Sequence, residues 1–290
     1  MPLTLRNHNH RPRRPNLPLA GIVDRHLLYE ASVQAVHLDL VFLDRLCRRR
    51  RGKPLRSLAE DFCGTAVLAC TFVKRHPENR AWGVDLDAST LDWCRRHNFP
   101  VLGKNAQRMM LLCEDVRRVA RPRVDLVTAV NFSYSVFITR EDLLAYFRKV
   151  RQSLVEDGIF VLDAFGGSES MGPLEEKRRI PASISFDGRR VPSFTYVWHQ
   201  ERFNTIDHHI VCHISFRFRD RSRHERAFTY DWRLWTLPEL REILLQAGFI
   251  STEVYMEGWD HENNEADGIF RRRKRFENQA GWVGYLVAYR

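Results

Sequence analysis

Residues 58–69 read Leu-Ala-Glu-Asp-Phe-Cys-Gly-Thr-Ala-Val-Leu-Ala, and residues 82–87 read Trp-Gly-Val-Asp-Leu-Asp. The pattern predicts a strand that runs into a tight turn around Gly64, then a helix, then a second strand that ends in Asp85. In such a β-α-β unit the turn lets backbone N–H groups approach a ligand, and the acid can accept hydrogen bonds from two ribose hydroxyls. The stretch therefore predicts a nucleoside-binding unit.

These residues resemble the first motif of the class I S-adenosylmethionine (SAM)-dependent methyltransferases, which reads roughly acid-x-Gly-Cys-Gly-Thr-Gly. Phe62 and Ala66 stand where that motif has its outer glycines, so only Gly64 is kept. A dinucleotide pyrophosphate needs those glycines for close backbone approach, whereas SAM has no phosphate. The departures thus favour SAM over NAD or FAD as the cofactor. An ordinary strand–turn–helix unit of another α/β protein is the alternative.

Outward from this unit, predicted strands and helices alternate along the chain, which is typical of a doubly wound parallel sheet. Strands are predicted over residues 56–61, 81–84, 109–113, 124–130, 159–164, 251–257 and 281–288. The predicted fold class is α/β, with a Rossmann-like doubly wound seven-stranded sheet. The resemblance implies that the last strand is antiparallel to the others.

Two regions add to this sheet. Apolar residues recur at helical spacing in a lead-in over residues 19–54, and three antiparallel strands are predicted within an insert over 166–235. Residues 186–235 hold eleven of the 33 aromatic residues. This enrichment suits a wall over the active site or a dimer surface, and also a sheet that packs its own apolar face on the core.

Composition limits the organisation of the chain. Its 290 residues suit one domain over 19–290, preceded by a disordered basic tail over 1–18. The sequence contains no run of 18 or more apolar residues, so no membrane span is predicted. Its six cysteines lack Cys-x-x-Cys spacing, which favours a reducing, cytoplasmic setting. A monomer or a homodimer is expected.

The net charge of +10 is unevenly distributed. Three acid-free stretches, 6–14, 48–53 and 271–275, hold fourteen positive charges, so the remainder of the chain carries −4. Such runs could bind nucleic acid. Solubility and charge complementarity at helix C-termini are the favoured interpretation.

The resemblance implies a set of cofactor contacts at the strand ends. Glu60 matches the acid of the first motif, and Asp61 beside it could share that role. Asp85 matches the ribose-binding acid, and Asp115 an acid that faces the adenine amino group. The remaining expected cofactor contacts are Cys63, Gly64, Thr65, Leu86, Val116 and Asn131.

Residues 131–134, Asn-Phe-Ser-Tyr, partly match the Asn-Pro-Pro-Tyr motif of amino-methyltransferases. Asn131 and Tyr134 are therefore candidates for positioning the methyl acceptor. The favoured interpretation is a looser turn that touches the carboxylate or sulfonium of SAM. Further candidates for substrate contact are Tyr29, Arg233, which could pair with a substrate carboxylate, and Trp235.

Methyl transfer needs a general base only where the acceptor must lose a proton. The candidate bases, among which the sequence does not choose, are His199, His208, His209, His213 and Glu257. No metal site is predicted. The acidic and histidine cluster from Asp260 to Asp267 is better explained as a solvated loop that balances residues 271–275.

The expected function is methyl transfer from SAM to a nitrogen or oxygen nucleophile of a small molecule. Two alternatives remain at this point. One is methylation of a nucleobase or RNA amine, and the other is a SAM-binding protein without catalysis.

Overall fold

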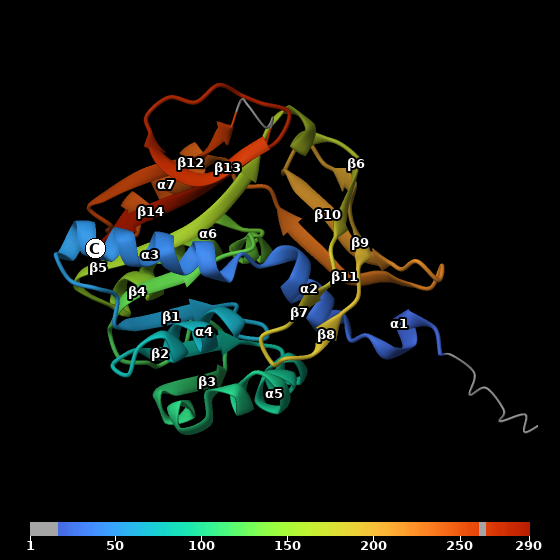
Figure 1. Ribbon diagram of the computed structural model, residues 1–290. Coiled ribbons are helices and arrows are strands. Elements are labelled where there is room, and N and C mark those ends of the chain that lie inside the picture. Colours follow the sequence, from blue (N-terminus) through green and yellow to red (C-terminus); the bar gives the residue numbers. More distant parts are fainter. Residues whose placement is uncertain (1–16, 261–264) are drawn as a thin grey trace, which may run out of the picture.

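A computed structural model describes residues 17–260 and 265–290, so most of the expected tail over 1–18 lies outside the described residues. An eight-stranded sheet forms the centre of the molecule (Figure 1). Its strands are β1 (Ser57–Asp61), β2 (Arg80–Asp85), β3 (Met109–Cys113), β4 (Val124–Ala129), β5 (Leu154–Gly166), β12 (Ser251–Asp260), β13 (Glu265–Arg273) and β14 (Trp282–Tyr289).

The strand order is β13-β12-β14-β5-β4-β1-β2-β3. Strands β1 to β5 pair in parallel, and β14 is antiparallel to both β5 and β12. The α/β class and the antiparallel last strand are confirmed. The expected number of seven strands was wrong, because β13 adds an eighth at the edge. This strand holds Arg271–Arg273 of the third basic stretch. Because an edge strand needs no apolar face, this segment is rich in charged residues and lacks the apolar pattern by which strands are predicted from sequence.

Helices cover both faces of the sheet. Helices α3 (Val36–Arg51), α4 (Val67–Arg75) and α5 (Ala88–His97) contribute to the core on one face. Helices α6 (Arg140–Gln152) and α7 (Leu237–Gln246) pack on the other. None of the helices within the described residues is long and apolar enough to cross a bilayer.

The helical lead-in also includes α1 (Leu19–Ile22) and α2 (Arg25–Val33). Three short 3-10 segments, η1 (Phe99–Arg108), η2 (Ser133–Val136) and η3 (Ser168–Met171), connect the larger elements. Helix α2 packs with the insert in a cluster of its own, which includes Leu28 and Phe216. The lead-in thus joins the insert to the main sheet.

The insert forms a second, antiparallel sheet of order β11-β10-β9-β6, which stands beside the carboxyl ends of the main strands (Figure 1). Its bounds are β6 (Leu174–Ile180), β9 (Phe194–Phe203), β10 (His209–Arg217) and β11 (Arg223–Arg233), with a small ribbon of β7 (Ser183–Ile184) and β8 (Arg190–Val191). The sequence predicted β9 to β11 and missed β6. Five of its seven residues are exposed, so it lacks an apolar signal.

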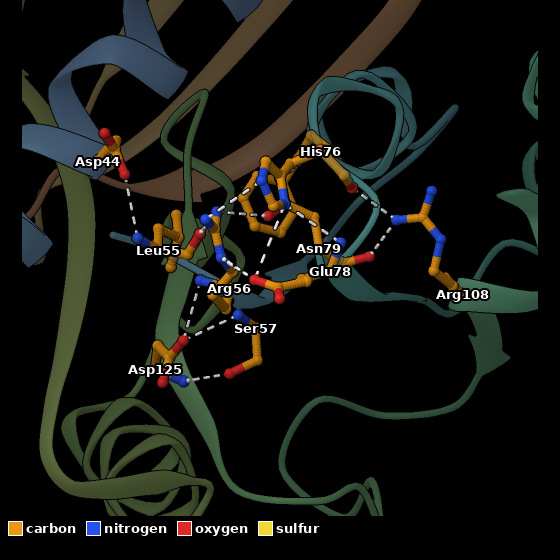
Figure 2. Close-up of polar contacts among 10 residues, drawn as sticks. Asp44, Leu55, Arg56, Ser57, His76, Glu78, Asn79, Arg108 and Asp125 are labelled. Carbon is orange, nitrogen blue, oxygen red and sulfur yellow. Dashed lines mark hydrogen bonds and ion pairs between the residues drawn. The ribbon is translucent and has the colours of Figure 1, made fainter. Parts of the chain in front are cut away.

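The amino ends of the parallel strands lie on the side opposite the insert, and we call this side the amino edge of the main sheet and the other the carboxyl edge. Polar groups at the amino edge are closely paired (Figure 2). Asp125 accepts hydrogen bonds from the backbone N–H groups of Arg56 and Ser57, at 3.0 and 2.9 Å. Arg108 donates to three carbonyl oxygens near the end of α4. Arg51 pairs with Asp125 at 2.5 Å, and both side chains are largely buried. This edge is closed by its own ion pairs and hydrogen bonds.

Candidate functional site

The turn between β1 and α4 has the left-handed backbone conformation that glycine favours, although two glycines of the family motif are replaced. Phe62, Gly64 and Ala66 have φ values of 57°, 52° and 52°. Side chains disfavour this left-handed region, which costs roughly 1–2 kcal/mol per residue. The chain therefore holds a strained turn in which glycine is kept at only one of the three positions. Strain that is maintained in this way is commonly found at ligand sites.

Asp85 at the end of β2 faces this turn. Its carboxylate accepts hydrogen bonds from the N–H of Gly64 at 2.8 Å and from the N–H of Asp87 at 2.9 Å. Burial raises the pKa of Asp85, and these backbone donors lower it in part. Leu86 beside it is 70% exposed. The turn and the acid at the end of β2 therefore lie against each other.

Glu60 and Asp61 are neighbours, but they point to opposite faces of the sheet, as alternation along a strand requires. Glu60 accepts from the N–H of Ala69 in the first turn of α4 at 2.9 Å, and burial raises its pKa to about 8. Asp61 pairs with Arg121, and both side chains are fully buried. Tyr146 also donates to Asp61, at 3.1 Å. Asp61 therefore does not share the position of Glu60, because the other face of the sheet already provides its partners.

Around the turn, Cys63 and Thr65 are buried, and the N–H of Cys63 donates to the carbonyl of Val84 at 2.9 Å. This bond joins the turn to β2. Within the described residues, the buried Thr65 hydroxyl makes no hydrogen bond of normal geometry, but it lies close enough to the Glu30 carboxylate to lower its pKa. A buried hydroxyl that is so weakly paired suits a site that a polar ligand completes.

Asp115 and Val116 follow β3. The Asp115 carboxylate is bound by Arg117, with N–O distances of 2.7–3.1 Å, and this hydrogen bonding lowers its pKa. Val116 is buried in the core on the α6 face. The pair thus lies at the same edge of the sheet as Asp85, with the carboxylate of Asp115 already partnered by a cation.

The turn after β4 is held by an acid that was not among the residues predicted for the site. Asp163 on β5 accepts hydrogen bonds from the N–H groups of Asn131 at 2.7 Å and Phe132 at 2.8 Å. Both turn residues have positive φ values, 59° and 57°. Burial raises the pKa of Asp163 to about 7. An acid inside the apolar run 159–164 was the available signal for this role.

Tyr134 lies away from solvent. Its side chain is 2% exposed and packs in the core on the α6 face, and burial raises its pKa well above the usual range. Stacking of Tyr134 on an acceptor, as in the Asn-Pro-Pro-Tyr motif, would require this core to open. Asn131 remains partly exposed at the turn.

Helix α2 brings two more titratable groups to this edge. Burial raises the pKa of Tyr29 to about 12, and the nearby carboxylates of Asp163 and Asp85 also raise it. Burial raises the pKa of Glu30 to about 7. Asn98 donates to Glu30 at 2.8 Å and to the carbonyl of Thr65 at 2.9 Å. Asn98 thus links the lead-in to the turn through two hydrogen bonds.

Arg233 and Trp235, expected near the substrate, are occupied elsewhere. Arg233 pairs with Glu239 at 3.0 Å and lies over the Trp235 ring at 3.8 Å. Trp235 is 2% exposed, and its indole N–H donates to the carbonyl of Phe137 at 3.0 Å. These contacts join β11 to the start of α7, and they account for both side chains without a substrate.

The candidate bases lie on the insert and on β12. His213 contacts Glu201 at 2.9 Å and Thr229 at 3.0 Å, and His209 pairs with Asp231. Glu201 and Asp231 are exposed to solvent. His213 follows Cys212, which points into the apolar cluster of the insert, so His213 points away from that cluster. The histidine partners therefore lie on the outer face of the insert.

Within residues 17–260 and 265–290, no group of three histidine, cysteine or acidic side chains is arranged to hold a metal ion. Part of the Asp260–Asp267 cluster, including His261 and Glu262, lies outside the described residues.

The sequence matches no known family model and no curated protein. The fold, however, is similar to solved structures. A SAM-dependent methyltransferase from Clostridium acetobutylicum matches with a TM-score of 0.62 and 19% identity, over 90% of this chain and 96% of that one. An amino pentose methyltransferase from Micromonospora echinaspora, involved in calicheamicin biosynthesis, matches with a TM-score of 0.61 and 16% identity, over 92% and 96%.

A sugar N-methyltransferase from a Streptoalloteichus species also matches, with a TM-score of 0.60 and 16% identity, over 92% of this chain and 93% of that one. These likenesses extend across the main sheet and the insert, since each covers nine-tenths of the chain or more. The protein therefore has the fold of the class I SAM-dependent methyltransferases.

Proposed function

We propose that the protein transfers a methyl group from SAM to a nitrogen or oxygen nucleophile of a small molecule. One observation carries this proposal: the carboxylates of Glu30, Glu60, Asp85 and Asp163 gather at the carboxyl edge without an ion-pair partner among the described residues. Burial accordingly raises the pKa of each. Buried carboxylates of this kind favour a cationic ligand, which would replace their lost hydration. SAM carries a sulfonium and an ammonium group.

The residues present fit this molecule. The strained turn at Gly64 offers its backbone, Asp85 would bind the ribose, and Glu30 with the Thr65 hydroxyl beside it suits the amino-acid end. We assign Leu86, Asp115 and Val116, which follow β2 and β3, to the adenine side of the site. We leave Asp61 out of this site because Arg121 already neutralises it.

SAM supplies a methyl group on a sulfonium, and the chain must align the acceptor and exclude water. Asn131 and Tyr29 lie at the edge near Asp163, and Phe132 packs against Phe165 with ring centroids 4.7 Å apart. We assign Asn131 and Tyr29 to the acceptor side. One structural neighbour is named an amino pentose methyltransferase and another a sugar N-methyltransferase, which supports a nitrogen acceptor.

A nucleic acid acceptor is less well supported, because part of the basic run 48–53 is taken up in ion pairs. Arg48 pairs with Asp44, and Arg51 with Asp125 and Asp157. Phosphate contacts would have to break these pairs. Neutralised cations make a weak electrostatic footprint for RNA.

Isothermal titration with SAM tests the first step, and formation of S-adenosylhomocysteine with a panel of amino sugars and other small amines tests the second. Saturable SAM binding followed by turnover is expected. Binding without turnover across metabolite extracts would favour the non-catalytic alternative, and no binding at millimolar SAM would refute the proposal.

A further inference from the structure

A pocket of about 760 Å³ lies away from the turn at Gly64, between the start of α7, the first half of β12 and residues 272–278. Its volume falls within the range of small-molecule sites, roughly 300–1,000 Å³. Residues 165–171, at the end of β5, form one side. In Figure 1 the segment that leaves β13 arches over this part of the sheet. The eighth strand therefore creates a cavity that the seven-stranded plan does not include.

Backbone contacts fix the position of this arch. The N–H groups of Ser168 and Glu169 donate to the carbonyls of Gln279 and Ala280, each at 3.0 Å. Gly167 lies directly beneath, with a φ of 124°, and a Cβ there would stand 2.3 Å from the carbonyl oxygen of Ala280. Only glycine allows this approach. The roof of the pocket is thus held in place without a ligand.

The pocket is strongly basic. Five cations line it against two acids, Glu253 and Glu277. Glu253 is already occupied, since it pairs with Arg272 and accepts from the Tyr255 and Tyr289 hydroxyls at 2.8 Å. Arg273, Lys274 and Arg275 have no ion-pair partner among the described residues. The basic run 271–275 therefore supplies uncompensated positive charge to this pocket.

The walls between these cations are apolar. Phe165, Met171, Leu237, Phe276 and Trp282 all line the pocket. Inorganic phosphate or an RNA backbone would contact the cations but would leave these apolar side chains exposed to solvent. We propose that the pocket binds an organic anion, with an apolar body against these walls and an acidic group facing Arg273, Lys274 and Arg275.

The fluorescent probe 1-anilinonaphthalene-8-sulfonate tests this assignment on the full chain, because it joins an apolar body to one anionic group. Its uncharged analogue N-phenyl-1-naphthylamine is the matched probe. We expect saturable binding of the sulfonate that the triple variant Arg273→Gln, Lys274→Gln, Arg275→Gln weakens by about tenfold, as the loss of three exposed attractions implies. Binding of the uncharged analogue should not change.

A control variant makes the same change of charge on the insert, with Arg202→Gln, Arg219→Gln and Arg221→Gln, three exposed arginines outside the pocket. It should bind the sulfonate as the parent does. Equal affinity in the parent and in the Arg273–Arg275 variant, or equal weakening by both triple variants, would overturn the proposal.

Competition against the bound probe distinguishes the classes of anion that the pocket could bind. Octyl phosphate and octanoate should displace the probe at concentrations at which inorganic phosphate and an RNA oligonucleotide do not. Displacement by inorganic phosphate or by RNA at equal concentration would refute the organic-anion assignment. Saturating S-adenosylhomocysteine should leave the probe bound, so the outcome does not depend on whether the protein binds SAM.

Discussion

The charged side chains at the amino edge of the main sheet differ from those at the carboxyl edge in how they are paired. At the amino edge, Asp125 pairs with Arg51. Asp125 also accepts hydrogen bonds from two backbone N–H groups, and Arg108 donates to the carbonyls of His76 and Asn79 (Figure 2). At the carboxyl edge, Glu30, Glu60, Asp85 and Asp163 form no ion pair within the described part of the chain.

The difference separates stability from function. Paired charges at the amino edge lock the strands together, whereas buried acids without cations destabilise a folded chain unless a ligand compensates them. Asp61 is the exception that tests this interpretation, since it lies at the carboxyl edge and has Arg121 as its partner.

The largest expected effect is therefore structural. Asp61→Ala would leave the guanidinium of Arg121 buried and unpaired, and should lower the free energy of unfolding by about 3–5 kcal/mol. Urea denaturation followed by circular dichroism measures this loss. The double variant Asp61→Leu, Arg121→Met should recover much of it. A loss below about 1 kcal/mol for the single variant would show that pairing with Arg121 does not make Asp61 more important for stability than the unpaired carboxylates are.

The second effect concerns the cofactor. Asp85→Ala removes two charged hydrogen bonds to ribose, each worth about 1.5–3 kcal/mol, so SAM affinity should fall on the order of 100-fold or more. The fold should persist, because the side chain is not part of the core. Isothermal titration gives the dissociation constant, with Asp92→Asn, an exposed change on α5, as the control. An unchanged constant would contradict the ribose assignment.

The third effect is a pH dependence. Burial raises the pKa of Glu60 from its usual 4.5 to about 8, and those of Glu30 and Asp163 to about 7. For an acid with a raised pKa, the contribution to stability is present below its usual pKa and is lost as pH rises through the folded value. Without ligand, the free energy of unfolding should therefore fall between about pH 5 and pH 8 through these groups.

SAM affinity should change in the opposite direction over the same range, because ionised carboxylates attract the cation. Titrations at pH 6, 7 and 8 in buffers of different ionisation enthalpy should show proton release on binding. Glu60→Gln should reduce both dependences, since glutamine keeps an acceptor for Ala69 and cannot ionise. A pH-independent affinity in the parent would count against a cationic ligand at this edge.

The smallest effect belongs to Arg233. Its partner Glu239 is partly exposed, so Arg233→Gln should lower stability by about 1 kcal/mol or less. SAM affinity and turnover should remain within twofold of the parent, because the side chain contacts α7 and the Trp235 ring. Thermal melting and a turnover assay measure both. A selective rise in the KM of the acceptor would restore Arg233 as a substrate contact.

The sequence alone determined the local units. Strand and helix periodicity, the turn at Gly64 and the acid at Asp85 predicted the β-α-β unit and the positions of the parallel strands along the chain. Such signals depend on neighbours within one turn or one strand, so they survive without tertiary information. The resemblance to the methyltransferases rested on these residues, and the fold agrees with it.

Tertiary structure decided which charged groups are free. Glu60 and Asp61 are adjacent in sequence, yet only Asp61 receives an arginine, from 60 residues away. Asp163 supports a turn 31 and 32 residues earlier, and the arch after β13 forms a pocket that its arginine-rich sequence does not reveal. Burial and ion pairing arise from contacts between distant segments, and those contacts exist only once the sheet, the lead-in and the insert have come together.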